Sequence, residues 1–466
     1  MKLALPKGRL LKDTAALLAE TGLGLTDYNE QSRSYHLTSP RFRNLLAKVF
    51  QEKDIPVQVA IGNYDLGICG HDWVQELLSR YPNESLVTVG ELAYGRGDLY
   101  LVASKHSGIS SIDDIGNGFD KVRIVSEYPN LAELFALKHR LRRFSVLPVW
   151  GAAEVYPPES AEMAIISENS VSSFEEYSLV TLARVLRSTA VLIANRHSLA
   201  SSDMSELLAG IPLSACEPDT DKPLCPPKLD RMESSPQHDA VVWLALPDGH
   251  QQQPTVDFLK RAGIQVKGYS KQFITRRPAI DLAGVSVKVI RPQDMPLHVA
   301  NNNFDLALTG EDWLTDHSCR FPSSPVQKIT TLGFGIVTIV AVVSESLPID
   351  NVNQLRAEAG KLLPTVRVAS EYVNIADKYA RENHLGRYRI IPTWGASEAF
   401  LPEDADLLIE NTQTGGTLKK HKLRVIDTLF KSSACLIANS NSLSNPMKRD
   451  RMRDIINTME QTAMKG

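Results

Sequence analysis

The chain has 466 residues, of which 43% are hydrophobic and 23% charged, and its formal net charge is −3. This is the composition of an ordinary globular protein, and the small net charge gives no sign of the basic surface that nucleic acid requires. The longest apolar run, residues 333–343, is far shorter than the roughly 20 residues of a membrane helix. We therefore expect a cytoplasmic protein with neither a nucleic-acid nor a membrane partner.

Short apolar runs alternate with helical patterns along the first 213 residues. Such alternation predicts parallel β-strands covered by α-helices, and therefore an α/β fold. In chain order, the expected elements are a strand at residues 2–5, a helix at 10–20, a strand at 122–125, a helix at 130–139 and a strand at 146–149.

This part of the chain is expected to hold more than one sheet. The apolar segment 98–103 predicts a crossing into a second lobe, and the segment 188–195 predicts the return strand. We therefore predict two lobes around a cleft, with lobe I formed by residues 1–95 and 181–213 and lobe II by residues 96–180.

The same segments return in the second half of the chain. A drift of only four residues in their offset indicates a duplicated domain rather than a short-period repeat. Residues 64–73, 123–128, 150–154 and 192–195 return as residues 304–313, 367–372, 394–398 and 436–439, at offsets of 240 to 244 residues.

The fold predicted is thus a tandem duplication of a two-lobed α/β domain. The second copy spans residues 240–466, with lobe I at 240–334 and 425–466 and lobe II at 335–424. Residues 214–239 are rich in proline, which removes backbone donors and favours extended chain, so they predict a linker.

The cysteines give no sign of a disulfide framework or a metal site. They are five in number and scattered, and none has metal-ligand spacing. We expect free thiols in a reducing compartment and no metal ligands from the protein.

The first copy carries two cations in a glycine turn between a strand and a helix. Lys7, Gly8 and Arg9 form this turn. Such a turn suits a diphosphate or triphosphate, because arginine makes bidentate contacts and lysine supplies a point charge. The alternative is an ordinary solvated turn. The second copy has Asp248 and His250 at the corresponding positions, so its cations are lost.

The second copy carries a different motif, a Thr/Gly turn between an apolar strand at residues 407–409 and a helix expected from Lys419. Glycines let the backbone approach an anion, and the N–H groups at a helix start favour negative charge. The alternative is a helix cap with a glycine turn. The first copy has Ile166 in place of the acid Glu410 and Val171 in place of a glycine, and a β-branched residue resists positive φ.

Further polar residues stand near these turns. Arg291 occupies the position of Gln51 in the first copy. Asp72 and Asp312 precede expected helices and are interpreted as helix caps. Glu154 and Glu398 follow small-residue turns, and either could cap a helix or face the cleft.

Taken together, the motifs resemble ATP phosphoribosyltransferase in its short catalytic form. The resemblance covers nearly the whole chain outside the linker. Its landmarks are Leu5 through Leu10, Lys53-Asp54-Ile55-Pro56, Asp65 through Gly70, Arg123 through Leu131, and Thr414-Gly415-Gly416-Thr417-Leu418.

The resemblance implies a fold like that of type II periplasmic binding proteins. It also implies Mg²⁺-assisted transfer of phosphoribose from phosphoribosyl pyrophosphate to N1 of ATP, the first step of histidine biosynthesis. The implied catalytic residues are Glu410, Lys7 and Arg9. The implied contacts to phosphoribosyl pyrophosphate are Thr412, Thr414, Gly415, Gly416, Thr417 and Leu418, and those to ATP or pyrophosphate are Gly8, Arg33, Arg291, Glu398 and Glu154.

The sequence ends soon after Ser442-Leu443, so we expect no appended regulatory domain, in which the chain is similar to short forms of the family. The resemblance therefore implies a fused pseudo-dimer and a possible regulatory partner similar to histidyl-tRNA synthetase, or further self-association. We expect the second copy to hold the main phosphoribosyl site and the first to be a degenerate mate that contributes Arg9 or Arg33. The alternatives are a regulatory or ligand-binding paralogue without activity, and phosphoribosyl transfer to another nucleobase-like acceptor.

Overall fold

The computed structural model describes residues 1–23, 25–29, 35–81, 85–112, 114–115, 121–167, 174, 176–214, 240–270, 274–413 and 415–464. Apart from residue 214, the predicted linker lies outside these residues, as do Arg33, Thr414 and Val171. The chain divides into two compact units. Unit 1 comprises Met1–Pro148, Tyr156–Met232 and Trp394–Ala399, and unit 2 comprises Val149–Val155, Glu233–Thr393 and Phe400–Gly466.

The first sheet of unit 1 is built around a strand of continuous apolar residues. Strand β1 is buried along most of its length, as expected for a central strand covered on both faces. It pairs in parallel with β3 and β4, and β11 then pairs antiparallel with β4 and β5. The strand order is β2 (His36–Thr38), β3 (Leu46–Gln51), β1 (Lys2–Lys7), β4 (Leu66–Gly70), β11 (Ala190–Asn195) and β5 (Leu86–Glu91).

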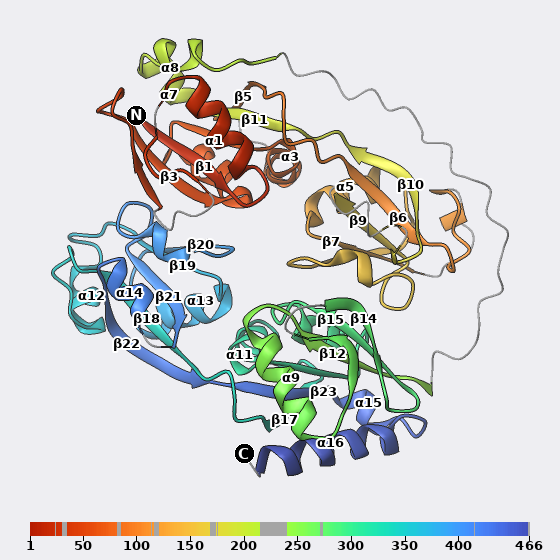
Figure 1. Ribbon diagram of the computed structural model, residues 1–466. Coiled ribbons are helices and arrows are strands. Elements are labelled where there is room, and N and C mark those ends of the chain that lie inside the picture. The colour runs from red at the N-terminus through yellow and green to blue at the C-terminus, as the bar shows by residue number, and fades with distance from the viewer. Residues whose placement is uncertain are drawn as a thin grey trace. The chain divides into compact units, whose positions relative to one another are not determined.

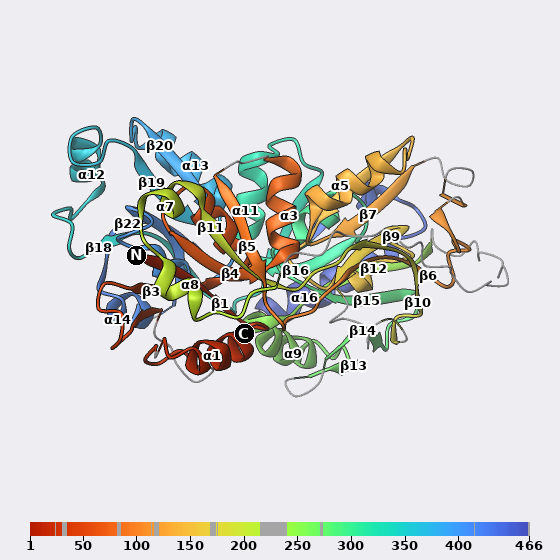
Figure 2. The ribbon, with the colours of Figure 1, turned by 90° about the horizontal axis from the view of Figure 1, so that it is seen from above.

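The second sheet of unit 1 contains the residues between β5 and β11. Helix α5 (Pro129–Lys138) packs on β7 and β8, and Figure 2 shows it beside β7. The strand order is β10 (Leu179–Leu186), β6 (Leu99–Ser104), β9 (Met163–Ser167), β7 (Val122–Ser126) and β8 (Phe144–Pro148). The other helices named in unit 1 are α1 (Leu11–Glu20), α2 (Ile55–Ala60), α3 (His71–Arg80), α7 (Arg196–Ser201) and α8 (Ser205–Ala209).

Unit 2 repeats both sheets. Its first sheet has the order β15 (Val285–Ile290), β12 (Val242–Pro247), β16 (Leu306–Gly310), β23 (Ala434–Asn439) and β17 (Val326–Thr331). Its second has the order β20 (Tyr388–Pro392), β19 (Val366–Ser370), β21 (Leu407–Thr412), β18 (Val337–Ser344) and β22 (Leu423–Ser432), and β13 (Val266–Tyr269) pairs separately with β14 (Ile274–Ile280).

The helices of unit 2 cover these sheets in the same way. Helix α13 packs on β19 and β20, and Figure 1 and Figure 2 both show it beside them. The named helices are α9 (Gln252–Arg261), α10 (Met295–Ala300), α11 (Glu311–Arg320), α12 (Val352–Glu358), α13 (Val373–Glu382), α14 (Gly416–Lys420), α15 (Ser440–Ser444) and α16 (Arg449–Met464).

Strand registers confirm the duplication residue by residue. Leu66 pairs with Ala194 in unit 1, and Leu306 pairs with Ala438 in unit 2. A slip of one residue would turn every side chain to the opposite face, so matching registers mean matching cores. The predicted α/β class and the duplicated two-lobed arrangement are therefore confirmed. Among the residues described, no helix is both long enough and apolar enough to span a membrane.

Each unit also contains a short segment from the other half of the sequence. In unit 2, the backbone N–H of Trp150 donates to both carboxylate oxygens of Asp294 at 3.0 Å, and its ring contacts Trp313 edge-on at 5.8 Å between centroids. In unit 1, the Lys53 ammonium lies 5.7 Å from the centre of the Trp394 ring. Residues 149–155 and 394–399 are thus part of cores formed mainly by the other copy.

Candidate functional site

The Thr/Gly turn of unit 2 is shorter than the sequence predicts. Strand β21 runs on through Thr412, because Thr412 still pairs with Thr338 of β18. Helix α14 begins at Gly416 instead of Lys419 and is one turn long. The turn itself is therefore limited to residues 413–415, and Thr414 lies outside the described residues.

Gly415 gives this turn its shape. It is the N-cap of α14 with φ 69°, a left-handed conformation that other residues rarely adopt. Its N–H donates to the hydroxyl of Thr412 at 3.0 Å. A Cβ at this position would meet no atom within 4 Å, so the space beside the backbone is open. The turn can therefore present backbone N–H groups and hydroxyls to an anion.

Glu410 lies in β21, just before this turn, and is held by its neighbour. One carboxylate oxygen accepts from the backbone N–H and the side-chain amide of Asn411, at 2.9 and 3.0 Å. The same amide donates to the Tyr372 hydroxyl at 3.1 Å, which in turn donates to Asp312 at 2.6 Å. Burial, together with the charges of Asp312 and Glu410, raises the pKa of Tyr372 well above its usual value. Glu410 is thus a fixed, buried acceptor suited to sugar hydroxyls.

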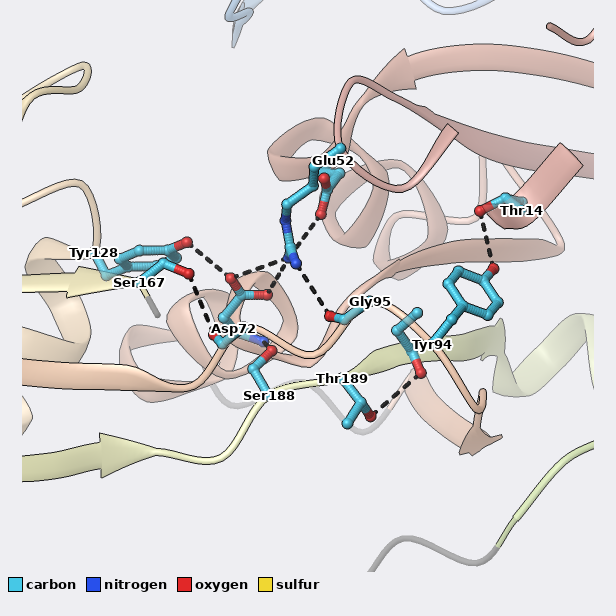
Figure 3. A network of polar contacts seen from close by, with 12 residues as sticks. Thr14, Glu52, Asp72, Tyr94, Gly95, Tyr128, Ser167, Ser188 and Thr189 are labelled. Atoms are coloured by element: carbon cyan, nitrogen blue, oxygen red, sulfur yellow. Dashed lines mark hydrogen bonds and ion pairs between the residues drawn. The ribbon is translucent and has the colours of Figure 1, made fainter. Parts of the chain in front are cut away.

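Arg9 in the first copy is surrounded by acidic side chains. Its guanidinium forms ion pairs with Glu52 at 3.0 Å and Asp72 at 3.4 Å, and donates to the Gly95 carbonyl at 3.1 Å. Figure 3 shows Glu52, Asp72 and Gly95 grouped at this point, with Tyr128 also reaching Asp72. Arg9 therefore serves first to neutralise two buried carboxylates.

The charges of this cluster are coupled. Burial raises the pKa of Glu52 to about 7, although the nearby Arg9 acts in the opposite direction. Burial acts to lower the pKa of Arg9, but the carboxylates of Glu52 and Asp72 outweigh it and the pKa is raised. Lys7 is exposed, and its ammonium lies 5.3 Å from the Tyr35 ring centre. Gly8 adopts φ 87° between the two cations.

Asp72 and Asp312 are not helix caps, and that prediction is wrong. Gly70 and Gly310 occupy the N-cap positions without side-chain caps. Each aspartate instead accepts a hydrogen bond from the tyrosine at the start of helix α5 or α13, at 2.8 Å for Asp72 and 2.6 Å for Asp312. A Cβ on either glycine would lie 2.0 Å from the aspartate, so only glycine fits there.

In unit 2, Asp248 occupies the position of Lys7 and forms ion pairs with two arginines. Its carboxylate lies 2.7 Å from Arg276 and 3.3 Å from Arg291. Sequence analysis selected Arg291 but missed Arg276, and the acidic substitution at residue 248 was the signal that could have suggested such a partner. Gln251 lies beside Gly310, where Arg9 lies beside Gly70 in the first copy.

The remaining predicted residues are scattered. Glu154 lies in a single 3-10 turn (Ala153–Val155) within unit 2, and Glu398 in a corresponding turn (Ser397–Phe400) at the unit 1 segment. Both side chains are half-buried. Leu418 is buried in α14 and anchors that helix. Arg33 lies outside the described residues.

The fold and these turns define a class of protein: a duplicated, two-lobed α/β protein whose strand-to-helix turns collect cations, hydroxyls and backbone N–H groups suited to phosphates. A family model, HisG: ATP phosphoribosyltransferase, matches residues 51–212 and 291–461, well over half of the chain. The chain belongs to this family, whose members are transferases of histidine biosynthesis.

Curated relatives support the same assignment. The ATP phosphoribosyltransferase of Chlorobaculum parvum is 32% identical over 215 residues, covering 46% of this chain and 69% of that protein. The enzyme of Thermodesulfovibrio yellowstonii is 31% identical over 217 residues, covering 47% of this chain and 70% of that protein. Each alignment covers about half of this chain, as expected if one half corresponds to one relative.

Among solved structures, the ATP phosphoribosyl transferase (HisG:HisZ) complex from Thermotoga maritima covers 48% of this chain and 100% of its own, at 20% identity and a TM-score of 0.39. A Candida albicans protein with the generic periplasmic binding protein fold covers 48% of this chain at 11% identity and a TM-score of 0.32. Scores of this size add no argument of their own.

Proposed function

We propose that this chain is an ATP phosphoribosyltransferase that transfers phosphoribose from phosphoribosyl pyrophosphate to N1 of ATP, with the phosphoribosyl site in the second copy. The observation that carries the proposal is the turn at Gly415, which is open beside its backbone and follows the fixed carboxylate of Glu410. The first copy has Ile166 in place of that acid.

In this proposal, the turn binds the 5-phosphate and Glu410 binds the ribose hydroxyls. Backbone N–H groups of Gly416 and Thr417, with the hydroxyls of Thr412, Thr414 and Thr417, are the donors, while the Gly415 N–H keeps its bond to Thr412 and shapes the turn. The side chain of Leu418 is apolar and buried, so it supports the turn rather than binding the phosphate.

The reaction needs positioning and charge stabilisation more than proton transfer. Adenine N1 attacks the anomeric carbon as the bond to pyrophosphate breaks, so negative charge grows on the leaving group. We assign Lys7, and Arg291 of the second copy, to anionic parts of the two substrates. Arg9 is already paired with Glu52 and Asp72. We therefore propose that it stabilises the turn at Lys7 and Gly8 and does not itself contact the substrates.

Mg²⁺ would be held mainly by the phosphate oxygens of the substrate, where it neutralises charge on the leaving pyrophosphate. No group of three or more His, Cys, Asp or Glu side chains able to hold a metal occurs in the described part of the chain. The acceptors nearest the proposed site, such as Glu410, fit contact with sugar hydroxyls better than a protein-built cage. We also place the protein in the cytoplasm, as a pseudo-dimer fused in one chain.

A second candidate is a regulatory or ligand-binding member of the family without transferase activity. The observation that favours it is that Arg9 of the first copy and Arg276, beside the corresponding turn of the second copy, are already paired with carboxylates. Transfer to another nucleobase-like acceptor is a further possibility, and a regulatory subunit similar to histidyl-tRNA synthetase is a possible partner in either case.

The test is incubation of the full chain with ATP, phosphoribosyl pyrophosphate and Mg²⁺, followed by mass spectrometry. We expect an adduct with the mass of phosphoribosyl-ATP. Replacing Thr414 and Gly415 should abolish the adduct, whereas the same change at Ser170 and Val171 should leave it nearly unchanged. Absence of any adduct, with ligand binding retained, would support the regulatory alternative.

A further inference from the structure

Asp248 is a buried carboxylate placed where the first copy has a lysine. It is 5% exposed and lies between two arginines, with its oxygens 2.7 Å from Arg276 Nη1 and 3.3 Å from Arg291 Nη1. The side chains of those arginines are 22% and 42% exposed, respectively. The cations therefore remain within reach of a ligand, while their counter-anion lies beneath them.

The backbone fixes this arrangement. Strands β12 and β15 pair in parallel up to Pro247 and Ile290, so the residues that follow, Asp248 and Arg291, leave the sheet side by side. The Asp248 N–H donates to the Ile290 carbonyl at 3.3 Å. Gly249 then adopts φ 69°, which turns the chain into the following helix.

Arg291 also passes close to the glycine of another segment of unit 2. The segment Val149–Val155 belongs to unit 2, and a Cβ on its Gly151 would lie only 3.2 Å from Arg291 Nε. On this side the arginine therefore packs against the segment at Gly151, while 42% of its side chain stays exposed. Any anion that binds here must share the two guanidinium groups with Asp248 or displace it.

We propose that Asp248 is a built-in competitor for the pyrophosphate group. The inference rests on the proposed function, in which this turn faces the anionic part of phosphoribosyl pyrophosphate. Two arginines and one aspartate leave a single net positive charge, and a carboxylate within ion-pair distance repels incoming phosphate oxygens. Asp248 thus weakens the binding of pyrophosphate and promotes its release, while leaving a lone 5-phosphate at the Gly415 turn unaffected.

The experiment measures binding without turnover. Inorganic pyrophosphate, and separately ribose 5-phosphate, are titrated into the full chain by isothermal calorimetry at fixed ionic strength. Asp248→Asn should lower the Kd for pyrophosphate by about tenfold or more and leave the Kd for ribose 5-phosphate unchanged.

A matched control separates this effect from a general loss of negative charge. Asp406 is also buried and pairs with an arginine, Arg367, at 2.8 Å, but in the second sheet of unit 2. Asp406→Asn should not tighten pyrophosphate binding. Adding Arg276→Gln to Asp248→Asn should remove the gain, because the freed cation is then absent.

Unchanged or weaker pyrophosphate binding in a folded Asp248→Asn variant overturns the inference, as does a gain that persists without Arg276. Thermal unfolding of each variant checks that it is folded. Failure of the proposed function gives a different result. Pyrophosphate binding would still tighten in Asp248→Asn, but the full chain would form no phosphoribosyl-ATP.

Discussion

Glu52 determines the charge of the first copy's turn. It has no acidic counterpart in the second copy, where Pro292 stands at the same place in the sequence motif. Its carboxylate is 8% exposed, yet it lies 3.0 Å from Arg9. Burial raises its pKa from the usual 4.5 to about 7, so the folded chain favours the protonated form of Glu52.

The sign of the resulting pH dependence follows from proton binding. Between the two pKa values the folded chain holds a proton on Glu52 that the unfolded chain has lost. Stability from this residue is therefore complete below about pH 4.5 and is lost as the pH rises towards 7. Between about pH 4.5 and 7 this effect lowers the free energy of unfolding by about 2 to 3 kcal/mol, and Glu52→Gln should remove that loss. Calorimetric melting at pH 5 and 7.5 should show the variant gaining relative to the natural chain at the higher pH, and an unchanged difference would contradict the assignment.

Gly415 permits a second prediction at the residue scale. Gly415→Ala forces a side chain into φ 69°, at a cost of about 1 to 2 kcal/mol, although the new Cβ meets no neighbour. We expect the loop to distort and phosphoribosyl-ATP formation to fall by at least about tenfold. Gly386→Ala is the control, since Gly386 has φ 67° and equally open surroundings. Equal losses of activity in both variants would contradict a role for the turn.

In each unit, a buried hydrogen bond from a tyrosine to an aspartate joins two helices. The aspartate lies in α3 or α11, and the tyrosine starts α5 or α13. Tyr128 donates to Asp72 and Tyr372 to Asp312. Either tyrosine-to-phenylalanine change should destabilise its unit by about 1 to 3 kcal/mol, the range for hydrogen bonds to charged groups. Tyr372→Phe should cost more, because Asp72 keeps the cation of Arg9 as a partner, whereas Asp312 keeps the neutral hydroxyl of Ser432. The melting temperature of each variant is the measurement.

Tyr379→Phe provides the control for this prediction. Its hydroxyl donates to Asp427 at 3.0 Å, but Asp427 is only half-buried, so water can still reach its carboxylate. Its loss should therefore cost less than half as much. If Tyr379→Phe lowers the stability as much as Tyr372→Phe, the buried Tyr372–Asp312 hydrogen bond is no more stabilising than the half-buried one.

Local patterns were enough to predict the elements but not their partners. Residues 2–5 and 10–20 were assigned from apolar runs and periodicity, and β1 and α1 confirm them. Asp72 was interpreted as a cap because the helix start is local, whereas its partner Tyr128 lies 56 residues away in sequence. Arg276 was missed for the same reason, since its contact with Asp248 depends on how two strands meet. The Thr/Gly turn was found because its chemistry is contiguous.

At the scale of the whole molecule, the two copies have diverged in complementary ways. The first keeps Lys7, Gly8 and Arg9, and the second keeps Glu410 and the Thr/Gly turn. Neither unit is formed by one copy alone, because residues 149–155 belong to unit 2 and residues 394–399 to unit 1. Because both copies are in one chain, each unit always has the segment that the other copy supplies.

A substitution at Trp150 tests whether residues 149–155 are part of unit 2. It belongs to the first copy by sequence but packs against the core of unit 2 that includes Trp313. Trp150→Ala should destabilise unit 2 by about 2 kcal/mol and increase hydrogen exchange in α11 and α13. The matched change Trp73→Ala removes a ring stacked on Tyr128 at 4.4 Å and should instead affect α3 and α5 of unit 1. Faster hydrogen exchange in unit 1 after Trp150→Ala would contradict the assignment of residues 149–155 to unit 2.

The phosphoribosyl site depends on one glycine turn in the second copy, at Gly415, which we expect to bind the phosphate ester of the sugar. The most direct measurement is a crystal structure of the full chain with phosphoribosyl pyrophosphate and Mg²⁺. We predict density for the 5-phosphate in the Gly415 turn, against the N–H groups of Gly416 and Thr417, with the ribose hydroxyls near Glu410. A well-occupied ligand elsewhere, with that turn empty, would contradict the account.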